Sequence, residues 1–179
     1  GKLIDPELYE QDRLHQVKGY ITDIFTDRAV SFIEQVQGKD KPFFLYIGHK
    51  AVHPESTQKD DGSIDLKKKR SYTPAPRHSG RYDGKTIQRA PNYGFSNEEE
   101  RSKPVLGSAL DFKHSPEIQK AFANVIDNGV SEETVRRRAE MILAVDEGLG
   151  RIIDTLEAKG ILDNTLILFT SDNGYFYGE

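Results

Sequence analysis

Apolar residues recur at helical intervals near the start of the chain. Between residues 20 and 38 they form one stripe, which consists of Phe25, Ala29, Phe32, Ile33 and Val36. Thr22 has a side chain suited to a helix N-cap, and Gly38 is the residue type that commonly ends a helix. The pattern therefore predicts an amphipathic helix between these two residues.

A longer helical pattern begins at Ser131 and ends near Gly160. Its apolar positions are three or four residues apart, at Val135, Ala139, Ile142, Val145, Leu149, Ile152 and Leu156. Glu132 and Glu133 lie where the positive end of a helix dipole favours acidic side chains. Because a glycine costs about 1 kcal/mol inside a helix, we expect Gly148 and Gly150 to permit close packing against a neighbouring element.

Two short apolar runs have the composition of buried strands. The first is FFLYI at residues 43–47, and the second is TLILFT at residues 165–170. Continuous apolar runs are typical of strands that are covered on both faces. Their alternation with the predicted helices indicates an α/β fold in which the two strands are parallel members of one sheet.

The regular patterns are lost between about residues 54 and 114. This stretch contains TPAPRHSGRYDG and RAPNYGFSNEEERSKP, which are rich in Pro, Gly, Ser and charged residues. Irregular stretches of this length in a compact domain are either functional excursions around a cleft or partly mobile insertions. Order resumes at Ser115, where a short helix is predicted with Pro116 in its first position.

Composition excludes several classes of protein. A chain of 179 residues, 36% of them hydrophobic, is long enough for one globular domain or a large piece of a bigger one. No apolar run approaches the roughly 20 residues that cross a bilayer. The net charge of −4 argues against nucleic-acid binding, and the absence of Cys excludes a disulfide, a zinc–thiolate site and a cysteine nucleophile.

Polar side chains follow both predicted strands. His49 and His53 come after the first strand, and Asp172 and Asn173 come after the second. Parallel strands bring their carboxyl ends to one edge of a sheet, where ligands bind in open α/β folds. Asp and Asn supply the oxygens that hard cations prefer, and histidine exchanges a proton near neutral pH. The same residues also suit an ordinary turn and a surface loop, so a non-catalytic binding or scaffold module remains an alternative.

Two longer segments carry a family resemblance. KPFFLYIGHKAVHPE and RAEMILAVDEGLGRIIDTLEAKGILDNTLILFTSDNGYFYGE resemble the middle of a type I sulfatase, a member of the alkaline-phosphatase-like superfamily. The resemblance implies that residues 1–179 form a single partial catalytic domain. Its fold would be part of a sandwich with a mostly parallel sheet, flanking helices and a long irregular insertion at about 54–114. The segment YTPAPRHSGRYDG resembles the insertions of sulfatases that act on glycans, which implies a sulfated carbohydrate substrate.

The resemblance also implies roles for three residues. Asp172 and Asn173 match the family's late Asp-Asn pair, which coordinates calcium, and the cation polarises the sulfate oxygens. His53 matches the histidine that contacts the sulfate and protonates the departing oxygen. His49 and Lys50 lie nearby, but no family role is carried over to them. Sulfatases of this kind are periplasmic, secreted or lysosomal, and the resemblance implies the same locations here.

Other parts of a sulfatase centre are missing from the sequence. The family's formylglycine is made from a Cys or Ser that stands two residues before a Pro or Ala, whereas in SYTPAPR those positions hold Tyr72 and Pro74. The early pair of metal aspartates also has no counterpart. We therefore expect an internal segment of a longer enzyme, inactive alone and with exposed apolar surface. A phosphate or phosphonate ester hydrolase of the same superfamily is the second alternative.

Overall fold

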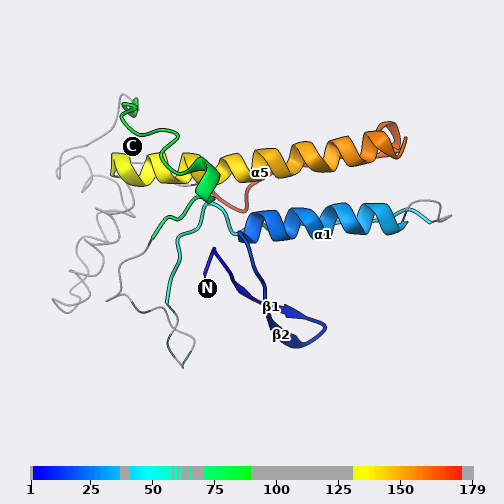
Figure 1. The fold of residues 1–179 in the computed structure, drawn as a ribbon. Helices are drawn as coiled ribbons and strands as arrows, with labels where there is room; N and C mark the ends of the chain where they lie inside the picture. Colours follow the sequence, from blue (N-terminus) through cyan, green and yellow to red (C-terminus); the bar gives the residue numbers. More distant parts are fainter. Residues whose placement is uncertain are drawn as a thin grey trace, which may run out of the picture. The chain divides into compact units, whose positions relative to one another are not determined.

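The computed structural model describes residues 2–36, 41–57, 71–89 and 131–174, together with residues 59, 61 and 65 (Figure 1). The chain divides into two compact units. The first, called the helix-pair unit below, consists of Gly1–Asp83 and Arg137–Phe169, and the second consists of Gly84–Arg136 and Thr170–Glu179. The short helix predicted from Ser115 lies outside the described residues.

A β-hairpin near the N-terminus forms the only sheet in the described part of the chain. Strand β1 (Glu7–Glu10) pairs antiparallel with β2 (Arg13–Gln16). The two turn residues, Gln11 and Asp12, have φ angles of 48° and 65°, as a two-residue type I′ turn requires. The sequence pattern did not predict this hairpin, because its segment ELYEQDRLHQ is mostly polar and shows little alternation.

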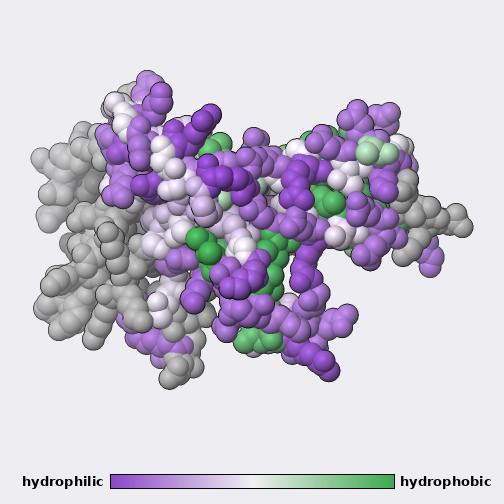
Figure 2. Space-filling model, in the orientation of Figure 1, coloured by the Kyte–Doolittle hydropathy of each residue, from purple (hydrophilic) through white to green (hydrophobic). Residues whose placement is uncertain are grey.

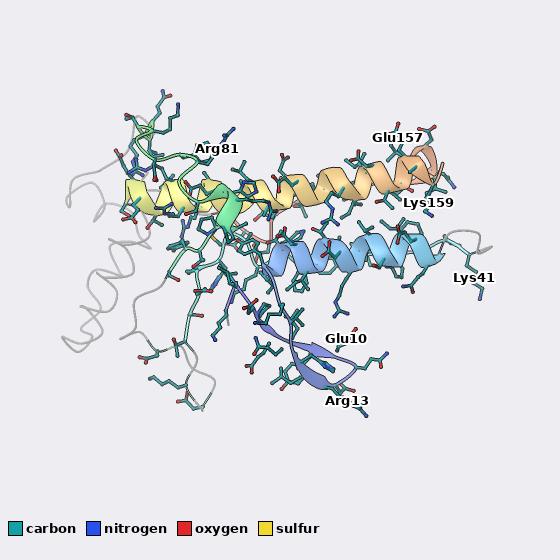
Figure 3. All side chains as sticks on the ribbon, viewed as in Figure 1. Glu10, Arg13, Lys41, Arg81, Glu157 and Lys159 are labelled. Carbon is teal, nitrogen blue, oxygen red and sulfur yellow. The ribbon has the colours of Figure 1, made fainter. Side chains whose placement is uncertain are left out.

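The hairpin is tied to the first helix by a charged contact. Glu10 of β1 forms an ion pair with Arg28 of the helix, and Figure 3 shows Glu10 and Arg13 at the turn end of the hairpin. Both side chains of the pair are half exposed, so solvent screens the attraction and the pair contributes little to stability.

The first predicted helix is confirmed as α1 (Ile21–Val36). Of the predicted stripe, Ala29 and Ile33 are buried. Thr22 lies inside the helix rather than at its cap, and its side chain is buried among the core residues. Gly38, the predicted stop, lies outside the described residues.

The longer predicted helix is confirmed as α5 (Glu132–Ala158). Ser131 caps it, because its Oγ accepts a hydrogen bond from the Thr134 N–H at 3.2 Å. The buried face follows intervals of three or four residues through Thr134, Arg138, Met141, Val145, Gly148, Ile152 and Leu156. Of the predicted stripe, Val145, Ile152 and Leu156 are buried, Val135, Ala139 and Leu149 are partly buried, and Ile142 is 40% exposed.

Two apolar clusters hold α1 and α5 side by side, and the helices run in the same direction (Figure 1). The first cluster consists of Leu3, Tyr20, Ile21, Ala75, Met141 and Ala144. The second consists of Ala29, Ile33, Ile152 and Leu156. Earlier residues of α1 thus meet earlier residues of α5 and later residues meet later ones, as parallel helices require.

The two helices approach closely at Gly148. A Cβ atom on this residue would lie 2.3 Å from the Thr26 Oγ1, which is shorter than any normal contact. The Thr26 hydroxyl is buried and donates to the Thr22 carbonyl at 2.9 Å, so it is satisfied within α1. The expected close packing against a neighbouring element is therefore confirmed for Gly148. It is not found at Gly150, where a Cβ would meet nothing within 4 Å.

An arginine from the stretch predicted to be irregular joins both helices. Arg77, in the short helix η1 (Pro76–His78), donates to both carboxylate oxygens of Asp23 on α1 at 2.7 Å each. It also donates to Glu147 on α5 at 2.7 Å. Burial opposes the ionisation of Glu147, but the hydrogen bond and charge of Arg77 outweigh this effect and lower the pKa of Glu147.

Neither predicted strand pairs with another strand among the described residues. In residues 43–47, Phe43, Leu45 and Ile47 pack against the second cluster, while Phe44 and Tyr46 are 87% and 82% exposed. This alternation has the period of a strand. Residues 166–169 are also largely exposed. The predicted parallel sheet is thus not formed within the described part of the chain.

The exposed side chains of these two runs agree with the expectation of exposed apolar surface. They are Phe44, Tyr46, Leu166, Leu168 and Phe169. Figure 2 shows hydrophobic side chains at the surface among hydrophilic ones on the face that it draws. Neither α1 nor α5 has the length and hydropathy of a membrane span, and the described residues contain no other candidate.

We predict opposite effects for alanine at the two α5 glycines. Gly148→Ala places a methyl group against Thr26 and should lower the free energy of unfolding by about 1–3 kcal/mol. Gly150→Ala should raise it by up to about 1 kcal/mol, because helix propensity improves where no neighbour is met. Urea unfolding followed by circular dichroism measures both. Adding Thr26→Ala should restore part of the loss in Gly148→Ala, and equal effects of the two glycine changes would contradict the close approach.

Candidate functional site

His53 lies in the helix-pair unit, directly after a tight turn. The turn is closed by a hydrogen bond from the His53 N–H to the Lys50 carbonyl at 2.7 Å. The His53 side chain is exposed, whereas Pro54 is buried. The turn therefore presents an imidazole at the surface next to a residue that is anchored in the interior.

One nitrogen of the His53 ring is bound to the protein's own backbone. Nδ1 lies 2.8 Å from the Pro54 carbonyl oxygen, and a carbonyl oxygen can only accept a hydrogen bond. Nδ1 therefore carries a hydrogen, and in the neutral ring Nε2 holds the lone pair. Nε2 is the nitrogen at which this side chain can take up or release a proton.

Glu55 fixes the backbone just beyond His53. Its N–H donates to the Ser71 carbonyl at 2.8 Å, and its carboxylate accepts from the Ser71 hydroxyl at 2.9 Å. The same carboxylate accepts from the Leu3 N–H at 2.5 Å, and the Thr73 hydroxyl lies 3.4 Å away. Three segments that are distant in sequence thus meet at one side chain.

Tyr20 supports the same segment from the core. Its hydroxyl donates to the Thr73 carbonyl at 3.0 Å, and only 4% of the residue is exposed. Burial, together with the negative charge of Asp23, raises the pKa of Tyr20 to about 12. The phenol therefore remains a hydrogen-bond donor at neutral pH.

His49 and His53 have different surroundings. The His49 ring is half-buried and its centroid lies 6.4 Å from that of Phe25 on α1. Burial lowers the pKa of His49, and its Nδ1 has no hydrogen-bond partner among the residues that the structure describes. His49 is thus a neutral ring packed against a helix. Lys50 contributes its carbonyl to the turn before His53.

Asp172 and Asn173 lie in the second unit, in a polar turn that follows the second apolar run. Asp172 Oδ1 accepts from the Asn173 N–H at 2.9 Å, and the Ser171 hydroxyl donates to the Asn173 carbonyl at 2.7 Å. Asn173 Nδ2 donates to the Gly174 carbonyl at 2.7 Å. An amide nitrogen does not coordinate a cation, so Oδ1 is the atom of the Asn173 side chain that a cation can use.

The chemistry of this turn fits part of a calcium site. Its exposed carboxylate and amide oxygens are the donors that calcium prefers, and a calcium ion takes roughly six to eight oxygens. The described residues contain no group of three or more His, Cys, Asp or Glu side chains that could hold a metal ion. Asp172 and Asn173 can therefore supply only a fraction of such a shell.

The meeting of His53 with Asp172 and Asn173 in one cleft stays a prediction. His53 belongs to the helix-pair unit, whereas the other two residues belong to the second unit. The sequence reasoning missed Glu55 and Tyr20. No local pattern marks Glu55, because its partners Ser71 and Leu3 lie 16 and 52 residues away.

Comparisons with known proteins agree with one another. The family model described as Sulfatase matches residues 3–179. An N-acetylglucosamine-6-O-sulfatase of Bacteroides thetaiotaomicron is 28% identical, over 100% of this chain and 38% of the relative. An arylsulfatase of Volvox carteri is 30% identical, over 89% of this chain and 23% of the relative.

A solved structure is similar over the same length. It shows a protein in complex with its substrate D-glucosamine-2-N,6-O-disulfate, and it matches with a TM-score of 0.61 and 27% identity. The match covers 100% of this chain and 42% of that chain. The chain thus spans less than half the length of the proteins that it matches here.

We predict that Tyr20 makes stability fall at high pH. The phenol ionises at about pH 10.0 in the unfolded chain and at about 12 in the folded one. Its contribution is therefore complete below pH 10 and is lost as the pH rises toward 12. Between pH 9 and 12, the difference in free energy of unfolding between wild type and Tyr20→Phe should fall by roughly 2–3 kcal/mol.

Urea unfolding at several pH values measures this difference. Tyr46→Phe is the matched control, because Tyr46 is 82% exposed and its replacement should leave the pH dependence of the wild type unchanged. A Tyr20→Phe protein that loses stability in parallel with the wild type would refute the assignment.

Proposed function

Because the chain belongs to the sulfatase family, we propose that it supplies a proton-donating histidine and part of a metal site to a longer enzyme that cleaves sulfate monoesters. The main support for this proposal is the hydrogen bond of the His53 ring. The exposed ring of His53 has Nδ1 bound to the Pro54 carbonyl, which leaves Nε2 for proton transfer. His53 is also the residue that the resemblance to sulfatases selects.

In the proposed reaction, His53 acts on the oxygen that leaves. A nucleophile from outside this chain attacks sulfur, the bond between sulfur and the ester oxygen breaks, and its electron pair stays on that oxygen. The imidazolium form of His53 donates its Nε2 proton, so that an alcohol leaves rather than an alkoxide. His53 becomes neutral and keeps its Nδ1 hydrogen on the Pro54 carbonyl.

Asp172 and Asn173 would hold a calcium ion through their side-chain oxygens. A bound calcium ion neutralises charge on the sulfate oxygens. In the turn, the Asp172–Asn173 and Asn173–Gly174 hydrogen bonds orient these side chains. The remaining ligands would come from residues outside this pair.

The proposed substrate class is a sulfated glycan. Support comes from two of the similar proteins, one named N-acetylglucosamine-6-O-sulfatase and one solved with glucosamine disulfate as its substrate. A sugar hydroxyl is a poor leaving group, so protonation by His53 has a large effect on such a substrate. A periplasmic, secreted or lysosomal location is the setting that we propose for this activity.

Replacement of His53 tests the proton donor. In the longer protein, His53→Ala should lower kcat for a sugar sulfate by about 10²–10⁴-fold. The loss should be much smaller for 4-nitrophenyl sulfate, because nitrophenolate leaves without protonation. Steady-state kinetics on both substrates measure this difference.

The control for this test is His15→Ala, since His15 is an exposed histidine on β2, and it should leave both rates unchanged. Equal losses on the two substrates would show that His53 does not protonate the leaving group. Unchanged rates on both would refute any role for it in the reaction.

Replacement of Asp172 tests the metal site. In the longer protein, Asp172→Asn removes a negative charge from the proposed calcium shell and should raise the calcium concentration for half-maximal activity at least about tenfold. Activity measured against free calcium after chelation gives this value. Asp163→Asn, at an exposed position of the short helix η2 (Leu162–Asn164), is the matched control. An unchanged calcium dependence in Asp172→Asn would remove this residue from the site.

A further inference from the structure

We propose that Glu55 is a positioning residue for His53. Through the Pro54–Glu55 peptide and its own carboxylate, it fixes the orientation of the imidazole and the nitrogen that carries the hydrogen. This inference rests on the proposed function of His53 as proton donor and adds a residue that acts through it.

A single peptide unit connects the two residues. Its carbonyl, from Pro54, accepts from His53 Nδ1 at 2.8 Å, and its N–H, from Glu55, donates to the Ser71 carbonyl at 2.8 Å. A trans peptide is planar, so its C=O and N–H point in opposite directions within one rigid plane. Fixing the N–H on Ser71 therefore fixes the direction in which the carbonyl meets the imidazole.

The Glu55 carboxylate strengthens this arrangement at Ser71. It accepts from the Ser71 hydroxyl at 2.9 Å, while the Ser71 carbonyl accepts from the Glu55 N–H. Ser71 is thus held through both its side chain and its backbone. A shift of the peptide plane would break two hydrogen bonds at once, which makes the direction of the Pro54 carbonyl well defined.

The other carboxylate oxygen links this arrangement to the core. It accepts from the Leu3 N–H, and Leu3 is fully buried in the first cluster. The Leu3 carbonyl in turn accepts from the Ile21 N–H at the start of α1 at 2.9 Å. A continuous series of hydrogen bonds therefore fixes the position of the His53 ring relative to the helix pair.

Both oxygens of Glu55 act as acceptors, and the one that faces the Leu3 N–H can only accept. The groups around it are the Leu3 N–H and the hydroxyls of Ser71 and Thr73. Among the described residues, Glu55 forms no ion pair with a cation. A glutamine has almost the same shape, but with its oxygen on the Leu3 N–H its N–H₂ group would face the Ser71 and Thr73 hydroxyls, which would then have to accept rather than donate. Glu55→Gln thus disturbs the hydrogen bonds while it preserves packing.

Long-range ¹H–¹⁵N NMR of the histidine ring nitrogens tests the proposal directly. In the wild type, His53 should show a protonated Nδ1 and an unprotonated Nε2 at a pH where the ring is neutral. In Glu55→Gln and Glu55→Ala, the His53 signals should change to those of a mixture of the two tautomers, while the His15 signals stay the same. Ser71→Ala should give a smaller change in the same direction.

Glu10→Ala is the matched control, because it removes a glutamate that joins the hairpin to α1 through Arg28. It should leave the His53 signals unchanged. If Glu55→Ala does not fold, Glu55→Gln and Ser71→Ala give the same measurement. A folded Glu55→Gln protein with an unaltered His53 tautomer overturns the proposal.

Kinetics of the longer protein supply a second readout. Glu55→Gln should lower kcat for a sugar sulfate by about 10–100-fold, with little change in KM and a smaller loss on 4-nitrophenyl sulfate. Glu55→Asp should restore part of the loss. If the tautomer responds to Glu55 while His53→Ala retains full activity, the proposed function fails and the positioning of the ring stands.

Discussion

The helix-pair unit depends on the close approach of α1 and α5 at Gly148. This contact lies between the two apolar clusters, because Tyr20 and Met141 precede it on their segments and Ile33 and Ile152 follow it. A side chain at residue 148 would push Thr26 away and would loosen both clusters together, since packed interiors have little free volume. The close packing of the two helices therefore requires that residue 148 has no side chain.

From this contact, a series of specific bonds leads to the surface. The first cluster holds Leu3, the Leu3 backbone binds Glu55, and the peptide before Glu55 binds the His53 ring. Arg77 holds the segment that contains η1 against both helices. The exposed imidazole is thus placed by rigid elements, although it lies on a loop. In this way a loop, although loops are usually mobile, can present a side chain in one orientation.

The sequence predicts most accurately those segments in which apolar residues recur at regular intervals over several helical turns. Both long helices were predicted to within a few residues, because each repeats its pattern over several turns. The prediction of which α5 residues are buried was less accurate, since Arg138 and Glu140 are buried while Ile142 is exposed. Charged residues can be buried when other groups neutralise them or form hydrogen bonds with them, and some of these groups come from distant parts of the chain. Glu140, for example, accepts from the Tyr82 N–H and from Arg137.

Asp27 of α1 and Arg151 of α5 are joined although they lie 124 residues apart in sequence. Closing a chain of this length costs conformational entropy, but that cost grows only with the logarithm of the number of residues. Doubling the intervening segment would add about 0.6 kcal/mol. The loop-closure entropy of the helix pair is therefore almost independent of the length of the connecting chain. The segments of that chain that carry Leu45, Ala75 and Arg77 are nevertheless tied to the two helices by packing and hydrogen bonds.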